Sequence, residues 1–330
     1  GEGWDASRIN VLIDLTTVTT SMSINQLRGR SMRLDKLWPE KVANNWDVIC
    51  LAEEFIKGFD DYERFERKHK NLYGVCDDGS IEKGVGHVHA AFTELQPEGV
   101  NEGMSLINQE MLQRARRRST TRDNWGIGQP FSAVARKSLE FSPSAPLGGI
   151  QYPFGKVAEP WTDASLNLAI IQAVASGMWE AGLLPKYAKI GGGERGGGWF
   201  RYFLEECTEE QSALFAEAIS EVFGPIDDAR YIISRSARFF DETFLSRLLP
   251  EVLAKYVRKE RKQVVMFYRV PSCLAGKKTH ATWFQKQWNK FVSPGRALYA
   301  HSKEGKEAMA FAKSLGLASN TVQHVKDVYL

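Results

Sequence analysis

Ile9-Asn10-Val11-Leu12-Ile13-Asp14-Leu15 is followed, after a turn rich in Thr and Ser, by Gln26-Leu27-Arg28-Gly29-Arg30-Ser31-Met32-Arg33. The first stretch is mostly apolar and predicts a buried strand over residues 9–15. The second carries three arginines and is expected on a helix over residues 23–34. Arg30 and Arg33 are three positions apart, so they share a face of that helix. The planar guanidinium group fits phosphate oxygens, so a strand, a polar turn and this helix together predict a phosphate-sensing element.

Two motifs in this region resemble those of a known family. Gln26-x-x-Gly29-Arg30-x-x-Arg33 is similar to motif VI of superfamily-two (DEAD/DEAH-type) helicases and translocases, and Gly1-Glu2-Gly3-Trp4-Asp5-Ala6 is similar to the Gly-x-Asp element of motif V. Their order and spacing agree with the second RecA-like domain of that family. The resemblance covers residues 1–53, in which residues 46–52 would form the last strand of the domain. The alternative is a basic amphipathic helix on an ordinary α/β surface.

The resemblance implies roles for individual residues. Arg30 and Arg33 would be catalytic, as arginine fingers that reach the γ-phosphate of ATP. The ATP-binding residues would be Gln26, Gly29, Gly3 and Asp5. Of these, Gly3 and Asp5 would also couple the nucleotide cleft to the nucleic-acid track. The implied cofactor is ATP with Mg²⁺.

The sequence contains only part of such a site. Phosphoryl transfer also needs a phosphate cradle and a metal-binding carboxylate. No G-x-x-x-x-G-K-[ST] sequence occurs, and Asp241-Glu242-Thr243-Phe244, which imitates a D-E-x-x box, follows motif VI, where helicase order does not place it. The first residue is not Met. We therefore expect a fragment of a longer bacterial protein, inactive alone, whose preceding RecA-like domain holds most of the nucleotide. Its apolar strand faces would lack their neighbours in isolation.

Composition is that of a soluble globular protein with two or three domains: 330 residues, of which 43% are hydrophobic and 25% are charged. The net charge of +3 does not by itself indicate nucleic-acid binding, so a basic surface must come from local clustering. The 4 cysteines form no C-x-x-C pair, which argues against a zinc ribbon and favours a reducing cytoplasm. The apolar stretch over residues 164–184 contains polar residues and predicts a core helix rather than a membrane span.

Three parts are expected along the chain: residues 1–53 as the end of a RecA-like helicase domain of the α/β class, residues 54–190 as an α+β accessory region, and residues 191–330 as a C-terminal α+β domain. The last boundary depends on Gly191-Gly192-Gly193-Glu194-Arg195-Gly196-Gly197-Gly198, which is interpreted as a flexible linker. The elements that follow have the order βαβ–βαβ, with a helix over residues 241–262 as an insertion. This order predicts a ferredoxin-like fold. The other elements expected there are strands 199–205, 230–234, 263–269 and 297–301 and helices 208–223 and 277–291.

Two groups of residues outside motif VI are candidates for nucleic-acid binding. Thr16 and Thr17 lie in the turn before the arginine helix, where hydroxyls and amides suit phosphate contacts, although capping the helix explains them equally well. Arg114, Arg117 and Arg118 belong to the basic end of a helix predicted over residues 101–123. The helix dipole favours cations there, but five arginines in nine residues exceed what capping needs.

Two further patterns have competing interpretations. His87-Val88-His89-Ala90-Ala91-Phe92 predicts a strand with both imidazoles on one face. The lack of Cys, Asp or Glu at ligand spacing favours a structural or nucleic-acid-facing pair over a metal site. Trp283 and Trp288 share a predicted helix with four lysines, which is compatible with nucleic-acid stacking. Core packing is the preferred explanation, with one indole buried and the other exposed.

The function predicted from these features is the C-terminal part of an ATP-dependent DNA helicase or translocase, which supplies arginine fingers and accessory nucleic-acid-binding domains. Its partners would be DNA, or RNA, and the upstream RecA-like domain of the same protein, with no membrane. The alternatives are a nucleic-acid- or partner-binding module and a translocating subunit of a restriction or defence system.

Overall fold

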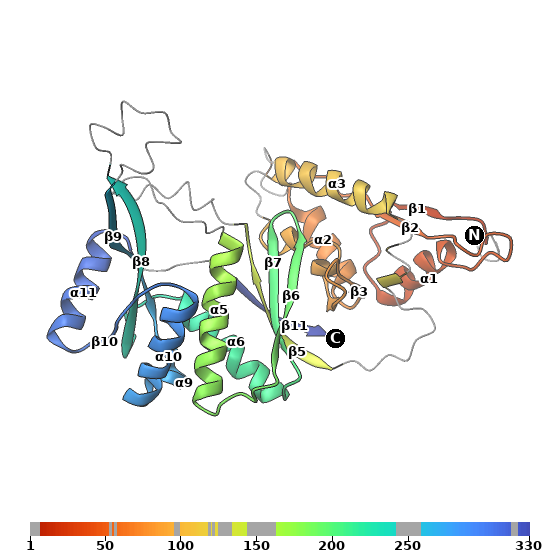
Figure 1. Ribbon diagram of the computed structural model, residues 1–330. Helices are drawn as coiled ribbons and strands as arrows, with labels where there is room; N and C mark the ends of the chain where they lie inside the picture. Colours follow the sequence, from red (N-terminus) through yellow and green to blue (C-terminus); the bar gives the residue numbers. More distant parts are fainter. Residues whose placement is uncertain are drawn as a thin grey trace. The chain divides into compact units, whose positions relative to one another are not determined.

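The computed structural model describes residues 7–52, 55, 58–95, 100–117, 120, 123–124, 134–143, 163–241, 259–317 and 323–330. These residues form a mixed α/β fold, as the sequence predicts at that general level (Figure 1). The chain divides into two compact units. Unit 1 contains residues 1–136, 193–201 and 327–330, and unit 2 contains residues 137–192 and 202–326.

The described strands belong to three sheets. The smallest is a pair, β1 (Val11–Asp14) and β2 (Asn44–Asp47). A second has the order β10 (Ala297–Tyr299), β8 (Tyr231–Asp241), β9 (Lys259–Arg269). The third has the order β3 (Tyr73–Val75), β4 (Ile81–Lys83), β11 (Gln323–Tyr329), β5 (Ala135–Phe141), β7 (Trp199–Glu205), β6 (Lys189–Gly196).

The βαβ element at the start of unit 1 contains the helicase-like motif. β1 and β2 are parallel, and α1 (Ser21–Ser31) connects them, because parallel neighbours require a crossover. Ile24 and Ser31 are buried on the inner side of α1. The strand is not buried, however: Val11 and Ile13 are 49% and 61% exposed, since no third described strand joins this sheet. This exposure agrees with the expectation that the strand faces lack neighbours.

A second core in unit 1 is built from aromatic residues of the helices that follow. α2 (Asp60–His69) packs Tyr62 and Phe65 against Phe92 and Ile107. Ile107 belongs to α3 (Val100–Arg116), and Phe92 belongs to the short turn η2 (Ala90–Thr93), which follows η1 (Val85–His87). The strand predicted over residues 87–92 is therefore wrong. Hydrogen bonds between near neighbours, such as Val88 N to Val85 O at 2.9 Å, close 3-10 turns there instead.

The glycine-rich segment over residues 191–198 is not a flexible linker. Most of it lies in β6, and the following turn leads directly into β7. Gly196, Gly197 and Gly198 have φ values of 92°, 59° and 80°, a conformation that costs glycine little because it has no Cβ. The boundary predicted at residue 191 therefore falls inside a strand.

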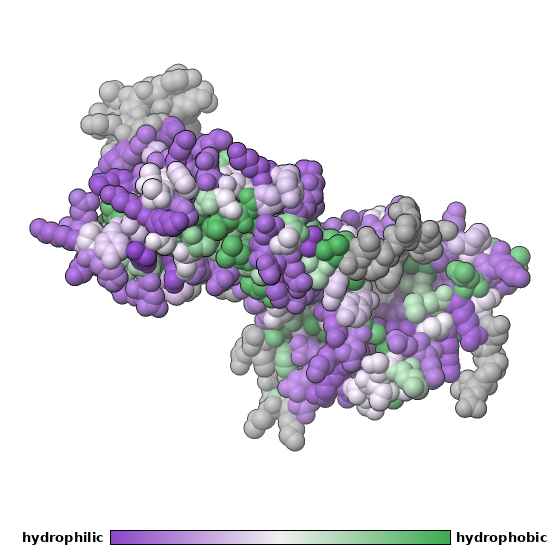
Figure 2. All heavy atoms as spheres, turned by 90° about the horizontal axis from the view of Figure 1, so that it is seen from below, coloured by the Kyte–Doolittle hydropathy of each residue, from purple (hydrophilic) through white to green (hydrophobic). Residues whose placement is uncertain are grey.

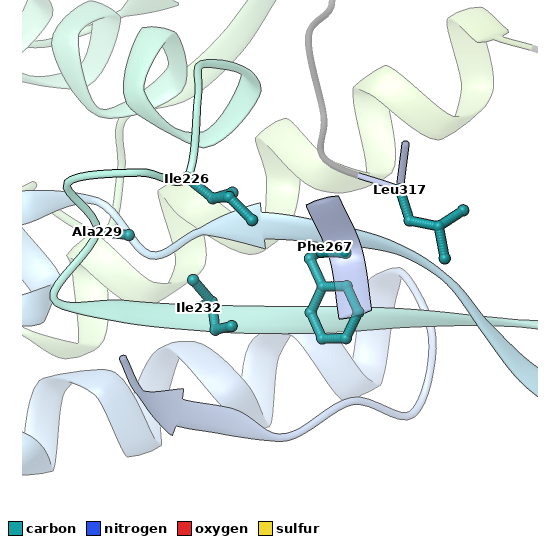
Figure 3. Close-up of a cluster of buried hydrophobic side chains, with 6 residues drawn as sticks. Ile226, Ala229, Ile232, Phe267 and Leu317 are labelled. Carbon is teal, nitrogen blue, oxygen red and sulfur yellow. The ribbon is translucent and has the colours of Figure 1, made fainter. Parts of the chain in front are cut away.

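The described part of unit 2 contains the three-stranded sheet and the helices α5 (Asp163–Glu180), α6 (Glu209–Phe223), α9 (Ser272–Ala275), α10 (Lys278–Phe291) and α11 (Lys303–Ser314). Ile232 of β8 and Phe267 of β9 pack with Ile226 and Leu317 in one buried cluster (Figure 3). Thr208 and Gln211 form a capping box at the start of α6.

The predicted ferredoxin-like arrangement is not confirmed. β7, the first strand of the predicted arrangement, belongs to the six-stranded sheet rather than to the sheet of β8, β9 and β10. The predicted helix over residues 241–262 is wrong at both ends, since Asp241 ends β8 and Lys259 begins β9. Residues 242–258, including the rest of the D-E-x-x imitation, lie outside the described residues.

The apolar helix α5 is a core helix, as predicted: Ile170, Val174 and Met178 are fully buried. None of the helices in the described ranges is long and apolar enough to cross a bilayer. On the face shown in Figure 2, hydrophilic residues predominate and hydrophobic ones are scattered among them. Such scattering is ordinary for a folded surface.

Candidate functional site

Charged side chains from four elements, β1, β2, α1 and α2, meet where the two strands end. Because Asp14 and Asp47 are paired in the parallel register, both carboxylates lie at the same edge. Lys68 of α2 lies with its Nζ 3.0 Å from Asp14 Oδ2 and 3.3 Å from Asp47 Oδ1. Arg28 of α1 donates from Nη2 to Asp47 Oδ2 at 2.8 Å. With His69, these residues form what we call the carboxyl-edge cluster, the position at which open α/β sheets bind ligands.

His69 joins this cluster as a neutral imidazole. Its Nδ1 lies 3.0 Å from the carbonyl oxygen of Phe65, and its Nε2 lies 3.0 Å from Nη2 of Arg28. A carbonyl only accepts and a guanidinium only donates, so the ring proton is assigned to Nδ1 and the lone pair to Nε2. Burial, reinforced by the charge of Arg28, lowers the pKa of His69 to about 4.

Thr16 has a structural contact in the turn after β1. Its backbone N and its Oγ1 donate to Asp14 Oδ1 at 2.8 and 2.7 Å. Burial alone would raise the pKa of Asp14, but the bonds from Thr16 and Lys68 outweigh it and hold the pKa below its usual value. The Thr16 hydroxyl is therefore already engaged by the protein, which favours the turn-forming alternative for this residue. Thr17 beside it is exposed.

Arg28 also sets which side of α1 faces outward. Successive residues of a helix are rotated by about 100°, so Gln26 and Arg30 lie roughly opposite Arg28. α1 ends at Ser31 rather than at residue 34, so Arg33 lies beyond the helix and the predicted helical face shared by Arg30 and Arg33 is not confirmed. Gln26, Arg30 and Arg33 are all exposed. No described residue forms an ion pair with Arg30, and the carbonyl of Arg33 accepts a hydrogen bond from Lys41 Nζ at 2.7 Å. The structure thus exposes Gln26 and Arg30 on the outward side of α1 and Arg33 two residues beyond its end, and we call these three residues the α1 arginine face.

Gly29 stands beside that face in open space. A Cβ added at Gly29 would meet no described atom within 4 Å. A glycine inside a helix is less favourable than alanine by roughly 0.5–1 kcal/mol, so its presence here is not explained by packing within the described residues. A bare backbone at this point permits close approach of a ligand.

At the basic end of α3, Arg114 forms contacts within the protein that the sequence does not predict. Arg114 donates to the carbonyl oxygens of Val88 and Val75 at 3.1 and 3.0 Å, and its Nε lies 3.1 Å from Asp77 Oδ1. Its guanidinium therefore joins α3 to β3 and to the turn after η1. Arg117 is exposed and lines, with Arg114, Asp77 and Glu194, a cavity of about 390 Å³ in unit 1.

Three predicted site residues lie outside the described residues: Gly3, Asp5 and Arg118. The two histidines considered for a metal site serve other contacts. His87 Nδ1 lies 2.6 Å from Gly84 O, and His89 Nε2 lies 2.8 Å from Glu110 Oε2. No group of His, Cys, Asp or Glu in the described part of the chain is arranged to hold a metal ion.

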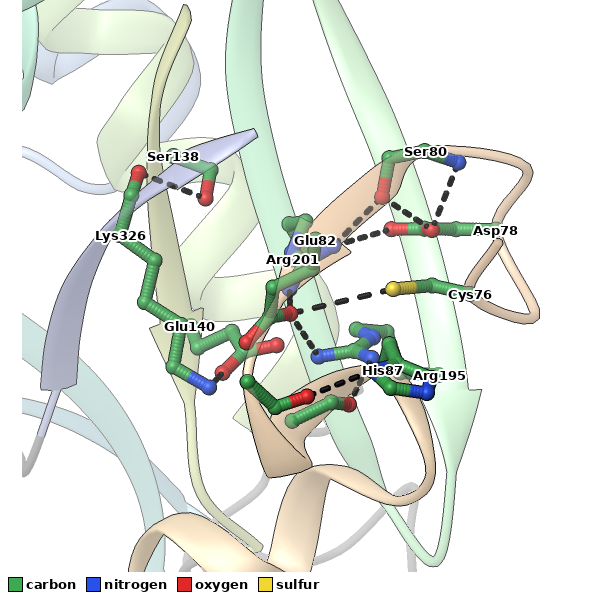
Figure 4. A network of polar contacts seen from close by, with 12 residues as sticks. Cys76, Asp78, Ser80, Glu82, His87, Ser138, Glu140, Arg195, Arg201 and Lys326 are labelled. Atoms are coloured by element: carbon green, nitrogen blue, oxygen red, sulfur yellow. Dashed lines mark hydrogen bonds and ion pairs between the residues drawn. The ribbon is translucent and has the colours of Figure 1, made fainter. Parts of the chain in front are cut away.

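A second buried network in unit 1 was not identified from the sequence (Figure 4). Glu82 on β4 accepts from Arg195 Nη1 at 3.1 Å and from Arg201. Arg201 also donates to Ser80 Oγ at 2.5 Å and is fully buried. Burial raises the pKa of the Cys76 thiol beside Glu82, so this thiol stays protonated and unreactive. The network therefore stabilises the fold by joining β4 to Arg195 and Arg201, and it is not a reactive centre.

Sequence reasoning missed both clusters because their members are far apart in the chain. The local signals were Asp14 near the end of the first apolar stretch, Asp47 near the start of the second, and the arginines at the glycine-rich segment. No protein-family model matches the chain, and comparison with curated proteins and with solved structures finds no significant match.

Proposed function

We propose that this chain supplies the arginine fingers of an ATP-dependent DNA helicase or translocase, as part of a longer polypeptide that holds the nucleotide. The observation that carries this proposal is the α1 arginine face. Gln26 and Arg30 are exposed on the helix of a parallel βαβ element and Arg33 is exposed just after its end, while Arg28, two positions before Arg30, is fixed inward by Asp47. This element is assigned to the tail of a RecA-like domain.

The geometry suits stabilisation of a transferring phosphoryl group. When water attacks the γ-phosphorus of ATP, negative charge spreads over the equatorial oxygens, and fixed cations lower the barrier. Arg30 and Arg33 would bind these oxygens, and Gln26 would orient the attacking water or the nucleotide. Mg²⁺ and the phosphate cradle would be held by the preceding domain, since no Walker A sequence occurs in this chain.

Buried anchoring supports this role for the exposed arginines. The Arg28–Asp47 pair is 15% and 8% exposed, and Lys68 joins Asp47 to Asp14 behind it. A finger is effective only if its backbone is held in place before the reaction, because ordering it during the reaction raises the barrier. The carboxyl-edge cluster would provide that rigidity.

The proposal is tested by measuring ATP hydrolysis stimulated by nucleic acid. The protein used is the polypeptide that joins this chain to the nucleotide-holding domain. Arg30→Ala and Arg33→Ala are each expected to lower kcat by about 10³-fold. Arg67→Ala is the matched control, because Arg67 is 59% exposed in the same unit and pairs only with exposed Glu63. Unchanged kcat in both finger variants would contradict the proposal.

A further inference from the structure

The helix α10 of unit 2 has one buried side and one free side. Ala281, Phe284 and Trp288 are buried, and Trp288 Nε1 donates to the carbonyl oxygen of Ser234 at 3.1 Å. A Cβ added at Gly177 of α5 would lie 3.2 Å from Phe284, which shows how closely the two helices pack. The apolar side of α10 is therefore committed to the core of unit 2.

A row of lysines occupies the free side. Lys278, Thr282, Lys286 and Lys290 follow one another at intervals of four residues and are all exposed. Such a row winds slowly around a helix and here extends over about 18 Å. Lys277, directly before the helix, is also exposed.

This lysine row has no acidic residue in its own helix, and the described carboxylate of Glu180, which reaches α10 from α5, lies 3.5 Å from Gln287 Nε2. The sequence of α10, KTHATWFQKQWNKF, contains no Asp or Glu. No described carboxylate pairs with Lys277, Lys278, Lys286 or Lys290. Elsewhere in unit 2, by contrast, exposed lysines do find partners: Lys189 Nζ lies 2.7 Å from Glu206, and Lys313 Nζ lies 2.5 Å from Asp227. The free side of α10 therefore has an uncompensated positive charge that complements a polyanion.

An aromatic platform lies at the edge of the row. Trp283 is 37% exposed, and its ring stacks on His280 with centroids 5.1 Å apart and planes inclined by 19°. Exposed aromatic rings next to cations are the elements with which proteins bind single-stranded nucleic acid, since bases stack on the ring while phosphates meet the cations.

We propose that the free side of α10 binds single-stranded nucleic acid, with Lys278, Lys286 and Lys290 at the phosphates and Trp283 stacked on a base. This surface lies in unit 2 and is argued independently of the α1 arginine face. An anionic membrane is a poorer fit, because interfacial helices insert a broad apolar face. The apolar face of α10 is already buried within the protein.

The test measures binding of the 330-residue chain to a fluorescently labelled oligothymidylate of about 20 nucleotides by anisotropy, across a salt series. Lys286→Gln with Lys290→Gln is expected to reduce the slope of log K against log salt by about 1.4, since each phosphate contact to a single strand contributes about 0.7. The matched control is Lys303→Gln with Lys306→Gln, which removes the same charge from α11, where Glu304 and Glu307 intervene.

The stacking is tested separately. Trp283→Leu is expected to weaken binding at least about fivefold, and Trp283→Phe should retain most of the affinity. Phe311→Leu, which alters another half-exposed aromatic ring in unit 2, should change nothing. Oligouridylate in place of oligothymidylate distinguishes RNA from DNA, and either one supports the proposal. Absence of binding, equal effects of the two lysine pairs, or preferential binding to phosphatidylserine vesicles would overturn it.

Discussion

Arg28 and Arg30, two positions apart in α1, lie on opposite sides of the helix. The Nη2 of Arg28 is bonded to Asp47 at 2.8 Å, whereas Arg30 is exposed. The helicase-like motif assigns a function to Arg30 and Arg33 but none to Arg28. Its role becomes visible only when β2 and α2 are brought beside α1.

These two arginines should therefore respond differently to truncation. Arg28→Ala leaves the largely buried Asp47 carboxylate with one cation fewer, and should lower the free energy of unfolding by about 2–3 kcal/mol. Arg30→Ala removes only exposed atoms and should change it by less than about 0.5 kcal/mol. Urea unfolding at neutral pH measures both values. Equal losses for the two variants would contradict the assignment of Arg28 as the anchor.

His69 should make stability depend on pH. Its pKa is about 4 when folded, against a usual value of 6.5, so the unfolded chain takes up the proton at higher pH. Stability from this group is fully present above pH 6.5 and is lost as pH falls toward 4. The full change is about 3 kcal/mol at most. Burial also lowers the pKa of His87, which acts in the same direction.

Thermal or urea unfolding between pH 7 and pH 4.5 tests this dependence. His69→Gln should be less stable at neutral pH but should have a flatter profile, because glutamine carries no titrating group. His301→Gln, which alters an exposed imidazole of unit 2, should leave the profile unchanged. A profile that stays equally steep in His69→Gln would show that another group causes it.

At the scale of the element, α1 contains a glycine that its own stability does not favour. Gly29→Ala should raise the free energy of unfolding by about 0.5–1 kcal/mol, since the added Cβ meets open space. In the nucleotide-holding polypeptide the same change should reduce ATP hydrolysis, because the methyl group would occupy the approach to the backbone. Urea unfolding and a steady-state ATPase assay give the two readouts. A variant that is stabilised and fully active would remove Gly29 from the site.

Elements defined by local pattern were predictable, and those defined by distant partners were not. β1 and α1 overlap the ranges predicted for them, but the strand predicted over residues 46–52 is wrong in its bounds, since β2 is Asn44–Asp47 and depends on pairing with β1. The segment over residues 191–198 was misjudged because its strand character comes from its place in the six-stranded sheet. Arg195 in that segment also binds Glu82, which lies 113 positions away. The apolar run over residues 87–92 resembles a strand, but its local hydrogen bonds close turns.

At the scale of the whole molecule, composition predicted an ordinary globular chain and no more. The net charge of +3 conceals two separate basic surfaces, one on α1 in unit 1 and one on α10 in unit 2. The split of the tryptophans was anticipated correctly: Trp288 is fully buried and Trp283 is exposed. The arginines of α1 were selected as a candidate site from the sequence, whereas core packing was preferred for the Trp–Lys helix, and the buried clusters required the folded chain.

Binding of a transition-state analogue tests the role of the α1 arginine face most directly. The polypeptide that joins this chain to the nucleotide-holding domain is titrated with ADP–aluminium fluoride and, separately, with a non-hydrolysable ATP analogue. Arginine fingers act mainly in the transition state, so Arg30→Ala and Arg33→Ala should weaken ADP–aluminium fluoride binding by at least about 100-fold. Their affinity for the ATP analogue should change by less than about threefold. Equal weakening for both ligands, or no weakening for either, would contradict the assignment of Arg30 and Arg33 as fingers.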